Sequence, residues 1–190
     1  MTKERPGSPR ARLFVALDLP PDVRADLARW RDVLVAPRED LRPVAEQALH
    51  VTLAFLGYRP EKEIDPIAEA MAEAVQERGP SPVLAPGEVK PIPPRRPRLF
   101  ALDLEDTEGA CVRLQQAVSD ALEERRFYKP EKRPFWPHIT LARVKRNLRA
   151  EPLPADPPPL GPFRAPQVTL YRSTLRPQGA QYDALAEVRL

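Results

Sequence analysis

The two histidines of this chain, His50 and His138, are the residues best suited to proton-transfer chemistry. Each opens a strand-like run, "HVTL" or "HITL", in which threonine stands two residues after the histidine. Because residues i and i+2 of a strand share one face, we expect Thr52 beside His50 and Thr140 beside His138, with the intervening residues in a core. The chain has six threonines, so this double placement is roughly a one-in-a-thousand coincidence.

Two facing imidazoles can act as a general acid and a general base. The ordinary histidine pKa near 6.5 allows one ring to be neutral and the other protonated around neutral pH. One ring then takes a proton from an attacking oxygen while the other gives a proton to a leaving oxygen. Threonine hydroxyls can hold non-bridging phosphate oxygens, where charge concentrates. The pattern therefore predicts in-line displacement at a strained phosphodiester.

Metal binding and a purely structural role are the alternatives for these histidines. A single histidine of this kind is more often a hydrogen-bonded structural residue, but two on matching elements favour function. Common metal sites use three or four protein ligands, and no carboxylate stands at a metal-like spacing from either histidine. A serine nucleophile elbow and a glycine-rich phosphate loop are also absent from the sequence. We expect no metal and no cofactor.

Arg143 and several aromatic residues are further candidates for substrate contacts. The Arg143 guanidinium suits phosphate geometry, but strand alternation places it on the face opposite His138, so a twist or bulge would have to turn it inward. We expect one aromatic side chain to stack on a nucleobase, although each could instead pack in the core, Phe14 above all. The candidates are Phe14, Tyr128, Phe135 and Trp136.

The elements that would carry the histidines occur twice. "RLFVALDL" at 12–19 is echoed by "RLFALDLE" at 98–105, and apolar periodicity predicts a helix after each, at 20–36 and 106–127. Each unit ends in its histidine strand. A duplicated unit packs about a pseudo-two-fold axis, with a ligand cleft between the halves. We expect an α+β fold of two similar lobes, with antiparallel sheets lining a central cleft and helices outside.

The rest of the chain predicts a helix at 61–78, strands near 81–90 and a terminal hairpin. Its strands, 165–175 and 180–190, are joined by the turn "RPQG". Proline-rich runs at 79–97 and 151–166 predict rigid connections. Residues 1–10 are expected to form a flexible tail, and residues 11–190 a single bilobal domain.

Composition and charge narrow the partners. The 190 residues, 42% apolar and 30% charged, suit one globular domain. Net charge is only +3, but residues 125–149 hold nine Lys or Arg against one Glu, and "PPRRPR" at 93–98 adds three cations. Such clusters attract polyanions, although a merely solubilising surface is the alternative. No apolar run is long enough for a membrane span, and the lone Cys111, expected as a buried thiol, favours a reducing cytoplasm.

Through its two runs "HVTL" and "HITL" and its first strand "RLFVALDL", the chain resembles the 2H phosphoesterase superfamily, in particular its RNA 2′,3′-cyclic phosphodiesterase branch, also called 2′-5′ RNA ligases. The resemblance covers residues 12–190 and implies metal-independent hydrolysis of an RNA 2′,3′-cyclic phosphate to a 2′-phosphomonoester, with reversible, ATP-independent 2′-5′ ligation. It implies His50 as proton donor, His138 as proton acceptor, and Thr52, Thr140 and Arg143 as phosphate contacts.

Two other functions remain open at this stage. One is hydrolysis of a small cyclic phosphate or a 2′-5′ oligonucleotide, and the other is non-catalytic binding of RNA ends. We expect a monomer that acts on RNA ends or nucleotides bearing a 2′,3′-cyclic phosphate. Proline-rich residues 152–160 are less typical of the family, and the sequence assigns them no role.

Overall fold

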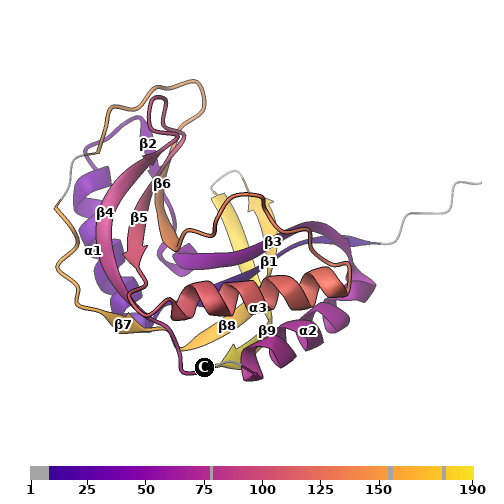
Figure 1. Ribbon diagram of the computed structural model, residues 1–190. Coiled ribbons are helices and arrows are strands. Elements are labelled where there is room, and N and C mark those ends of the chain that lie inside the picture. The colour runs from indigo at the N-terminus through magenta and orange to yellow at the C-terminus, as the bar shows by residue number, and fades with distance from the viewer. Residues whose placement is uncertain (1–8, 78, 154–155, 177–178) are drawn as a thin grey trace, which may run out of the picture.

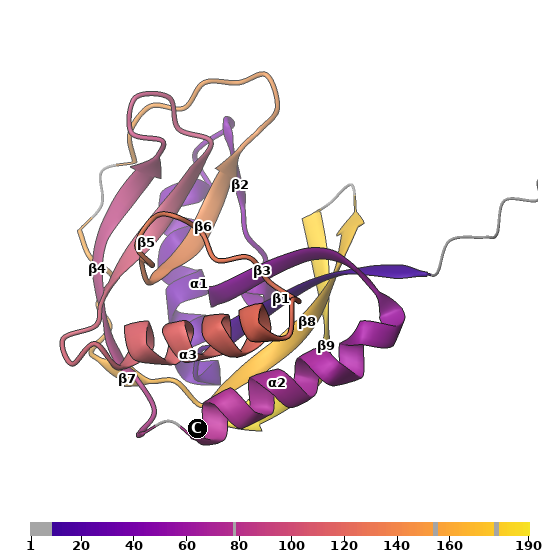
Figure 2. The same cartoon turned by 45° about the vertical axis from the view of Figure 1, so that its right-hand side comes forward.

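The computed structural model describes residues 9–77, 79–153, 156–176 and 179–190. Within these residues nine strands form one sheet in the order β7-β4-β5-β6-β3-β1-β8-β9, with β2 paired to β6, and every pairing is antiparallel. Figures 1 and 2 show the sheet curling round, with the helices on its outer side. The expected α+β fold with antiparallel strands and external helices is confirmed.

The predicted duplication is present as two strand–helix–strand units. The first unit consists of β1 (Arg10–Asp18), α1 (Pro21–Val35) and β3 (His50–Pro60). The second consists of β5 (Leu99–Glu105), α3 (Ala110–Glu124) and β6 (His138–Val144). In each unit the first strand pairs antiparallel with the histidine strand, so that Asp18 lies opposite His50 and Asp103 opposite His138. The two histidines therefore begin equivalent strands in equivalent hairpin-like pairs.

The helices bury one apolar side against the sheet. Helix α1 has Pro21 in its first turn, where proline fits a helix start, and α3 buries the stripe Cys111, Leu114, Val118 and Leu122. Helix α2 (Ile64–Gln76) follows a short 3-10 turn, η2 (Glu61–Glu63), so the predicted helix at 61–78 is shorter than expected. Figures 1 and 2 show α2 and α3 lying side by side beneath β1 and β3. Burial raises the pKa of the Cys111 thiol to about 12, as an inert thiol requires.

The predicted strand near 81–90 is confirmed, and it occupies much of a proline-rich run that was also expected to be a rigid connection. Most of 79–97 forms β4 (Val83–Ile92), which includes Pro86 and Pro91. Strand β4 pairs with β5 along one side, while its other side meets only the short β7 (Phe163–Arg164) at Val83 and Leu84. Proline is tolerated on such an edge because no ladder hydrogen bond is lost there. The second run, around β7, has little other regular structure among its described residues.

The chain ends in the predicted hairpin, β8 (Gln167–Arg176) and β9 (Gly179–Arg189). The turn residues 177 and 178 lie outside the described residues, as do residues 1–8 of the predicted tail. Strand β1 begins at Arg10, so the last residue of that predicted tail belongs to the sheet. No helix in the described part of the chain has the length and apolar character needed to cross a bilayer.

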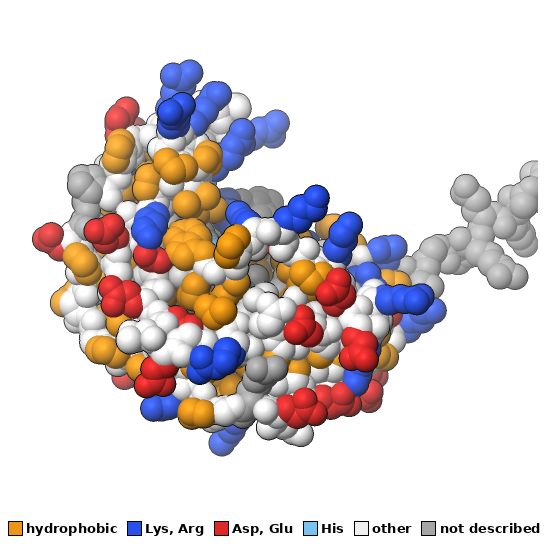
Figure 3. Space-filling model, in the orientation of Figure 1, with side chains coloured by type: hydrophobic (Ala, Val, Ile, Leu, Met, Phe, Trp, Pro, Cys, Tyr) orange, Lys and Arg blue, Asp and Glu red, His pale blue; other side chains and the backbone are white. Residues whose placement is uncertain are grey.

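Two apolar clusters support the site. The larger one lies between the sheet and the helices and includes Val51 and Ile139, the residues that follow the two histidines. The smaller one joins Val35 of α1 to Leu41 of β2 (Leu41–Pro43), Phe100 of β5 and Ala142 of β6. The space-filling view shows a notched outline, with Lys and Arg side chains gathered on the projection that carries β2, β4, β5 and β6 (Figure 3).

Candidate active site

The two histidine strands meet at one pair of residues. Val51 of β3 lies opposite Ile139 of β6 in antiparallel register, and both are fully buried. Extending this register by one residue each way sets His50 beside Thr140 and Thr52 beside His138. Since alternate residues of a strand point to opposite faces, all four side chains lie on the face away from the core. Each histidine therefore lies beside two threonines, the expected one on its own strand and one on the neighbouring histidine strand.

A bulge follows each motif at the same place. Leu53 is the extra residue of β3 against β1, between the pairs Ala16–Thr52 and Val15–Ala54. In β6 the extra residue is Leu141, between the pairs Ala101–Thr140 and Phe100–Ala142. A bulge puts two successive residues on the same side, and in both strands the leucine and the following alanine are buried.

The bulges reverse the alternation for the residues that follow. Arg143 thereby returns to the face of His138 and Thr140, and all three side chains line one cavity. The sequence had indicated that Arg143 could contact phosphate only if a bulge turned it to this face. In β3 the equivalent residue is Phe55, 45% exposed, which lines the cavity beside His50 and Thr52. Each half of the duplication thus contributes a histidine, a threonine and a third side chain, cationic in one half and aromatic in the other.

Both imidazole rings are held by a backbone carbonyl two residues upstream. His50 Nδ1 lies 2.8 Å from the Ala48 carbonyl oxygen, and His138 Nδ1 lies 2.7 Å from that of Trp136. A carbonyl only accepts, so Nδ1 carries the proton in each ring and Nε2 remains for chemistry. His50 Nε2 lies 3.0 Å from Thr52 Oγ1. Aromatic rings also fix the imidazoles: Trp136 stacks on His138 with centroids 4.3 Å apart, and Phe14 lies 5.0 Å from His50.

Burial favours the neutral form of both histidines. Desolvation lowers the pKa of His50 to about 4, although the Ala48 carbonyl and Asp18 act in the opposite sense, and the nearby charges of His138 and Arg143 lower it further. Desolvation also lowers the pKa of His138 from 6.5. These lowered pKa values favour two neutral rings at pH 7 in the ligand-free protein, so the ordinary histidine pKa near 6.5 does not apply to either ring there.

An aspartate stands behind each histidine. Asp18 is buried and accepts hydrogen bonds from Thr169 Oγ1 at 2.7 Å, Gln167 Nε2 at 2.8 Å and Tyr171 Oη at 3.0 Å. Asp103 accepts from Trp136 Nε1 and forms an ion pair with Lys90. Each carboxylate raises the pKa of its histidine, so it partly offsets the desolvation of that ring.

The histidines open into a cavity of about 650 Å³. Strands β3 and β6 form its base, and the β2 segment and the β8–β9 hairpin contribute its sides. Four arginines line it, namely Arg12, Arg42, Arg143 and Arg176, and the described lining contains no carboxylate. Such a cleft attracts an anion and can hold phosphoryl oxygens through guanidinium groups. In the described part of the chain no group of three or more His, Cys, Asp or Glu is arranged to hold a metal ion.

Known proteins match this chain over most of its length. A family model described as the 2′-5′ RNA ligase superfamily matches residues 19–176. The chain belongs to the 2′-5′ RNA ligase superfamily. An RNA 2′,3′-cyclic phosphodiesterase from Thermus thermophilus is 34% identical over 185 residues, 94% of this chain and 90% of that protein. One of the same name from Geobacillus stearothermophilus is 28% identical over 93% of this chain, but the chain spans only 56% of that protein.

Solved structures agree with the superfamily assignment. Escherichia coli LigT complexed with 3′-AMP has a TM-score of 0.80 at 27% identity, covering 96% of this chain and 99% of that one. A protein from Thermus thermophilus also has a TM-score of 0.80, at 32% identity, covering 94% of this chain and 97% of that one. The expected 2H phosphoesterase family and its fold are confirmed.

The four predicted stacking aromatics are spread over different surroundings in this superfamily member. Phe14 lines the cavity but is only 3% exposed, and it packs on His50, Tyr171 and Tyr182. Trp136 is taken up by its stack on His138. Tyr128 and Phe135 pack against the larger apolar cluster and are not among the described residues that line the cavity.

Several site residues of this superfamily member had escaped sequence analysis. Phe55 could have been found by aligning "HVTLAF" with "HITLAR", and the two aspartates by aligning the strands that end in "ALD". Arg12 carries a weaker signal, since it opens the first repeat; its guanidinium lies 4.6 Å from the centroid of the Phe55 ring. Arg42, Arg176 and Tyr182 come from the segment before β3 and from the terminal hairpin, which have no counterpart in the duplication.

Proposed function

We propose that the chain hydrolyses an RNA 2′,3′-cyclic phosphate to a 2′-phosphomonoester without a metal or cofactor. The observation that supports this most is the pair of imidazoles, each with Nδ1 bonded to a carbonyl, beside matched threonines in one arginine-lined cavity. Relatives named RNA 2′,3′-cyclic phosphodiesterase at 24–34% identity support the same reaction. Both histidines come from one chain, so we propose that residues 11–190 act as a single unit and as a monomer. The lone Cys111 supports a further proposal, that the protein acts in the cytoplasm.

The proposed reaction needs one proton removed and one delivered. Neutral His138 Nε2 takes a proton from water as the water oxygen attacks phosphorus. The bond from phosphorus to O3′ breaks, and protonated His50 gives its Nε2 proton to O3′. Thr52, Thr140 and Arg143 hold the non-bridging oxygens. With an RNA 5′-hydroxyl in place of water as the attacking group, and O3′ again leaving with a proton, the same groups would join the cyclic phosphate to that hydroxyl in a 2′-5′ bond without ATP.

The donor role of His50 requires that the ligand change its protonation. In the ligand-free protein the pKa of His50, about 4, leaves this ring neutral at pH 7. A phosphodiester anion bound between Thr52 and Arg143 would raise that pKa, because it places a negative charge beside the ring. The low pKa of His50 would suit the reverse assignment, with His138 as donor, and a substrate with a changed leaving group separates the two.

Phe55 is the side chain we propose for the nucleobase. It is exposed within the cavity, and the guanidinium of Arg12 lies over its ring. A base entering beside Phe55 would find an aromatic face close to the phosphate site. Phe14 and Trp136, already packed on the histidines, would support the catalytic rings instead of the base.

One assay tests the proposed reaction directly. The purified chain is incubated in excess EDTA with a 2′,3′-cyclic nucleotide, with RNA ending in a 2′,3′-cyclic phosphate and with a 2′-5′ oligonucleotide, and the products are identified. Formation of the 2′-phosphomonoester with EDTA present is the expected result. Binding without product would favour a protein that binds RNA ends without catalysis. Turnover only of the small cyclic phosphate or the 2′-5′ oligonucleotide would favour a phosphodiesterase for those substrates. Loss of activity on chelation would overturn the metal-free mechanism.

A further inference from the structure

A second hollow, of about 730 Å³, lies past the end of β6, between the segments 94–98 and 144–152. Six cationic side chains line it: Arg95, Arg96, Arg98, Lys145, Arg146 and Arg149. All six residues are exposed, and Glu151 is the one acidic residue in its described lining. We call this surface the basic groove. In Figure 3 it belongs to the projection on which Lys and Arg side chains gather.

Backbone hydrogen bonds hold both sides of the basic groove in place. The Val144 amide donates to the Arg98 carbonyl at 2.9 Å, and the Arg98 amide donates to the Ile92 carbonyl at 2.8 Å. The Lys145 amide donates to the Asp40 carbonyl at 2.8 Å. Asn147 has a φ of 65°, a left-handed conformation that asparagine tolerates better than most residues. The cations thus project from fixed turns, which reduces the entropy lost on binding.

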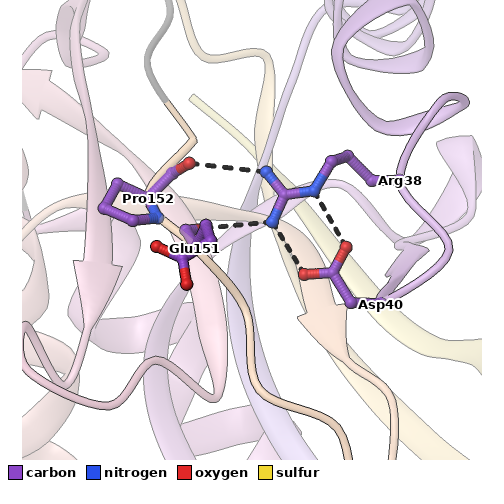
Figure 4. Close-up of polar contacts among 4 residues, drawn as sticks. All are labelled: Arg38, Asp40, Glu151 and Pro152. Carbon is purple, nitrogen blue, oxygen red and sulfur yellow. Dashed lines mark hydrogen bonds and ion pairs between the residues drawn. The ribbon is translucent and has the colours of Figure 1, made fainter.

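A hydrogen-bonded clamp fixes the far wall of the basic groove (Figure 4). The Arg38 guanidinium forms a two-point contact with Asp40, at 2.8 and 2.7 Å, and donates to the carbonyls of Glu151 and Pro152 at 3.0 and 3.4 Å. The Asp40 carboxylate is thereby occupied by Arg38. No cation of the groove forms an ion pair with a carboxylate within the part of the chain that the structure describes. The groove keeps a strongly positive field.

The basic groove lies close to the catalytic cavity, past the end of β6. Arg143 lines the cavity and Lys145, two residues on, lines the groove. Across the sheet, Arg42 pairs with Arg143, which in turn pairs with Leu99, the neighbour of Arg98. From His138 to Lys145 the path along β6 spans about 20 Å at the usual strand rise. That span exceeds one nucleotide, so a mononucleotide that reacts at His138 cannot reach the groove, whereas a chain of several nucleotides can.

We propose that the basic groove binds the phosphate backbone of the RNA chain whose 2′,3′-cyclic end lies in the catalytic cavity. This proposal rests on the proposed function and narrows its substrate to an oligonucleotide, as opposed to a mononucleotide. The groove lies about 20 Å along β6 from His138, it presents six cations on fixed turns, and its described lining lacks the exposed aromatic rings that would read bases. Recognition along it is therefore independent of sequence and strongly dependent on salt.

The test compares two triple variants matched in charge. The groove variant is Arg96→Ala, Arg146→Ala and Arg149→Ala. The control variant is Arg29→Ala, Lys62→Ala and Arg125→Ala, three exposed cations that line neither the cavity nor the groove. Two quantities are measured: kcat/KM for a 2′,3′-cyclic mononucleotide and for an oligoribonucleotide ending in 2′,3′-cyclic phosphate, and the Kd of a labelled single-stranded RNA as a function of salt.

We expect the groove variant to lose kcat/KM on the oligonucleotide while it hydrolyses the mononucleotide like the control. The logarithm of the RNA-binding constant falls linearly with the logarithm of salt concentration, and removing three phosphate contacts should make this slope shallower by about 2. Between 50 and 200 mM salt, the affinity of the unmodified protein should therefore fall about sixteenfold further than that of the variant. Equal oligonucleotide kinetics for both variants, or weaker RNA binding without an effect on kcat/KM, would overturn the groove as the path of the reacting chain. If nothing is hydrolysed, the proposed function fails, while the Kd comparison still decides whether the groove binds RNA.

Discussion

At the scale of single residues, the protonation of His50 and His138 decides how the site works. Each ring presents Nε2 because Nδ1 donates to a carbonyl, so neither ring can exchange its two nitrogens without losing that bond. The rings share the Nδ1 bond to a carbonyl but differ in two respects. His50 Nε2 also lies 3.0 Å from Thr52 Oγ1, and desolvation lowers the pKa of His50 to about 4. Donor and acceptor roles can therefore be separated by experiment.

The first prediction concerns the leaving group. His50→Ala should lower kcat on a normal 2′,3′-cyclic phosphate by about two orders of magnitude or more. A substrate with sulfur in place of O3′ needs no proton on departure, so it should restore most of that loss. His138→Ala should not be rescued by sulfur, because the acceptor is still missing. The opposite pattern, rescue of His138→Ala alone, would make His138 the donor.

The second prediction is the pH dependence, measured with a cyclic mononucleotide. The profile of kcat/KM reports pKa values of the free enzyme, and burial lowers both histidine pKa values below 6.5. Above pH 6.5 the form with one proton on the pair decreases tenfold per pH unit. We expect kcat/KM to peak between about pH 4 and 6.5, and kcat to stay high to higher pH, since bound phosphate stabilises the imidazolium. A kcat/KM optimum at or above pH 7 would contradict the lowered pKa values.

At the scale of elements, the matched bulges after Thr52 and Thr140 give the site its third side chain in each half. Alternation alone would turn Phe55 and Arg143 away from the histidines. The extra residues Leu53 and Leu141 restore them to the cavity face. Two strands of one sequence pattern therefore present an aromatic ring in one half and a guanidinium in the other, the groups that we propose for the base and for a phosphate oxygen.

The third prediction uses this difference. Phe55→Ala should raise KM for a cyclic mononucleotide about tenfold or more, since base stacking contributes about 1–3 kcal/mol, and should leave kcat within a few-fold. Tyr58→Ala is the matched control, because Tyr58 lies on the same strand, is 58% exposed and does not line the cavity. Steady-state kinetics of both variants provide the measurement. An unchanged KM in Phe55→Ala would remove Phe55 as the base contact.

Sequence patterns predicted the repeated elements well because local rules fix them. The paired threonines, the helical stripes and the two "RLF" strands follow from periodicity. The bulges carried no such signal, because Leu53 and Leu141 look like ordinary core residues of an alternating strand. Strand β4 was partly hidden by Pro86 and Pro91, which only an edge position makes acceptable. Arg42 reaches the site through the pairing of β2 with β6, a long-range contact that local spacing does not reveal.

At the scale of the whole molecule, placing two histidines in a cleft between packed halves lowers folding stability at acidic pH. Above pH 6.5 both rings are neutral in the folded and unfolded chains, so they contribute no pH dependence. As the pH falls from 6.5 towards 4, His50 becomes protonated in the unfolded chain but stays neutral in the folded chain. Folding stability is therefore lost across this window, by up to about 3 kcal/mol for His50. His138 adds a loss in the same direction.

The fourth prediction concerns folding stability between pH 6.5 and 4. Two carboxyls with lowered pKa values, those of Asp40 and Asp103, do not change stability in this range. Arg38 lowers the pKa of Asp40, and the pKa of Asp103 is lowered although burial opposes this, chiefly by its bonds with Lys90 and Trp136. Their stabilising effect is complete above their ordinary value near 3.8 and is lost only below it. His50→Asn puts a neutral amide where the ring stood, so between about pH 6.5 and 4.5 this variant should lose less stability than the unmodified chain in urea unfolding. His138→Asn should show the same change. Parallel stability curves for the unmodified chain and both variants would mean that neither ring resists protonation, and the acidic optimum of kcat/KM would then have to disappear with it.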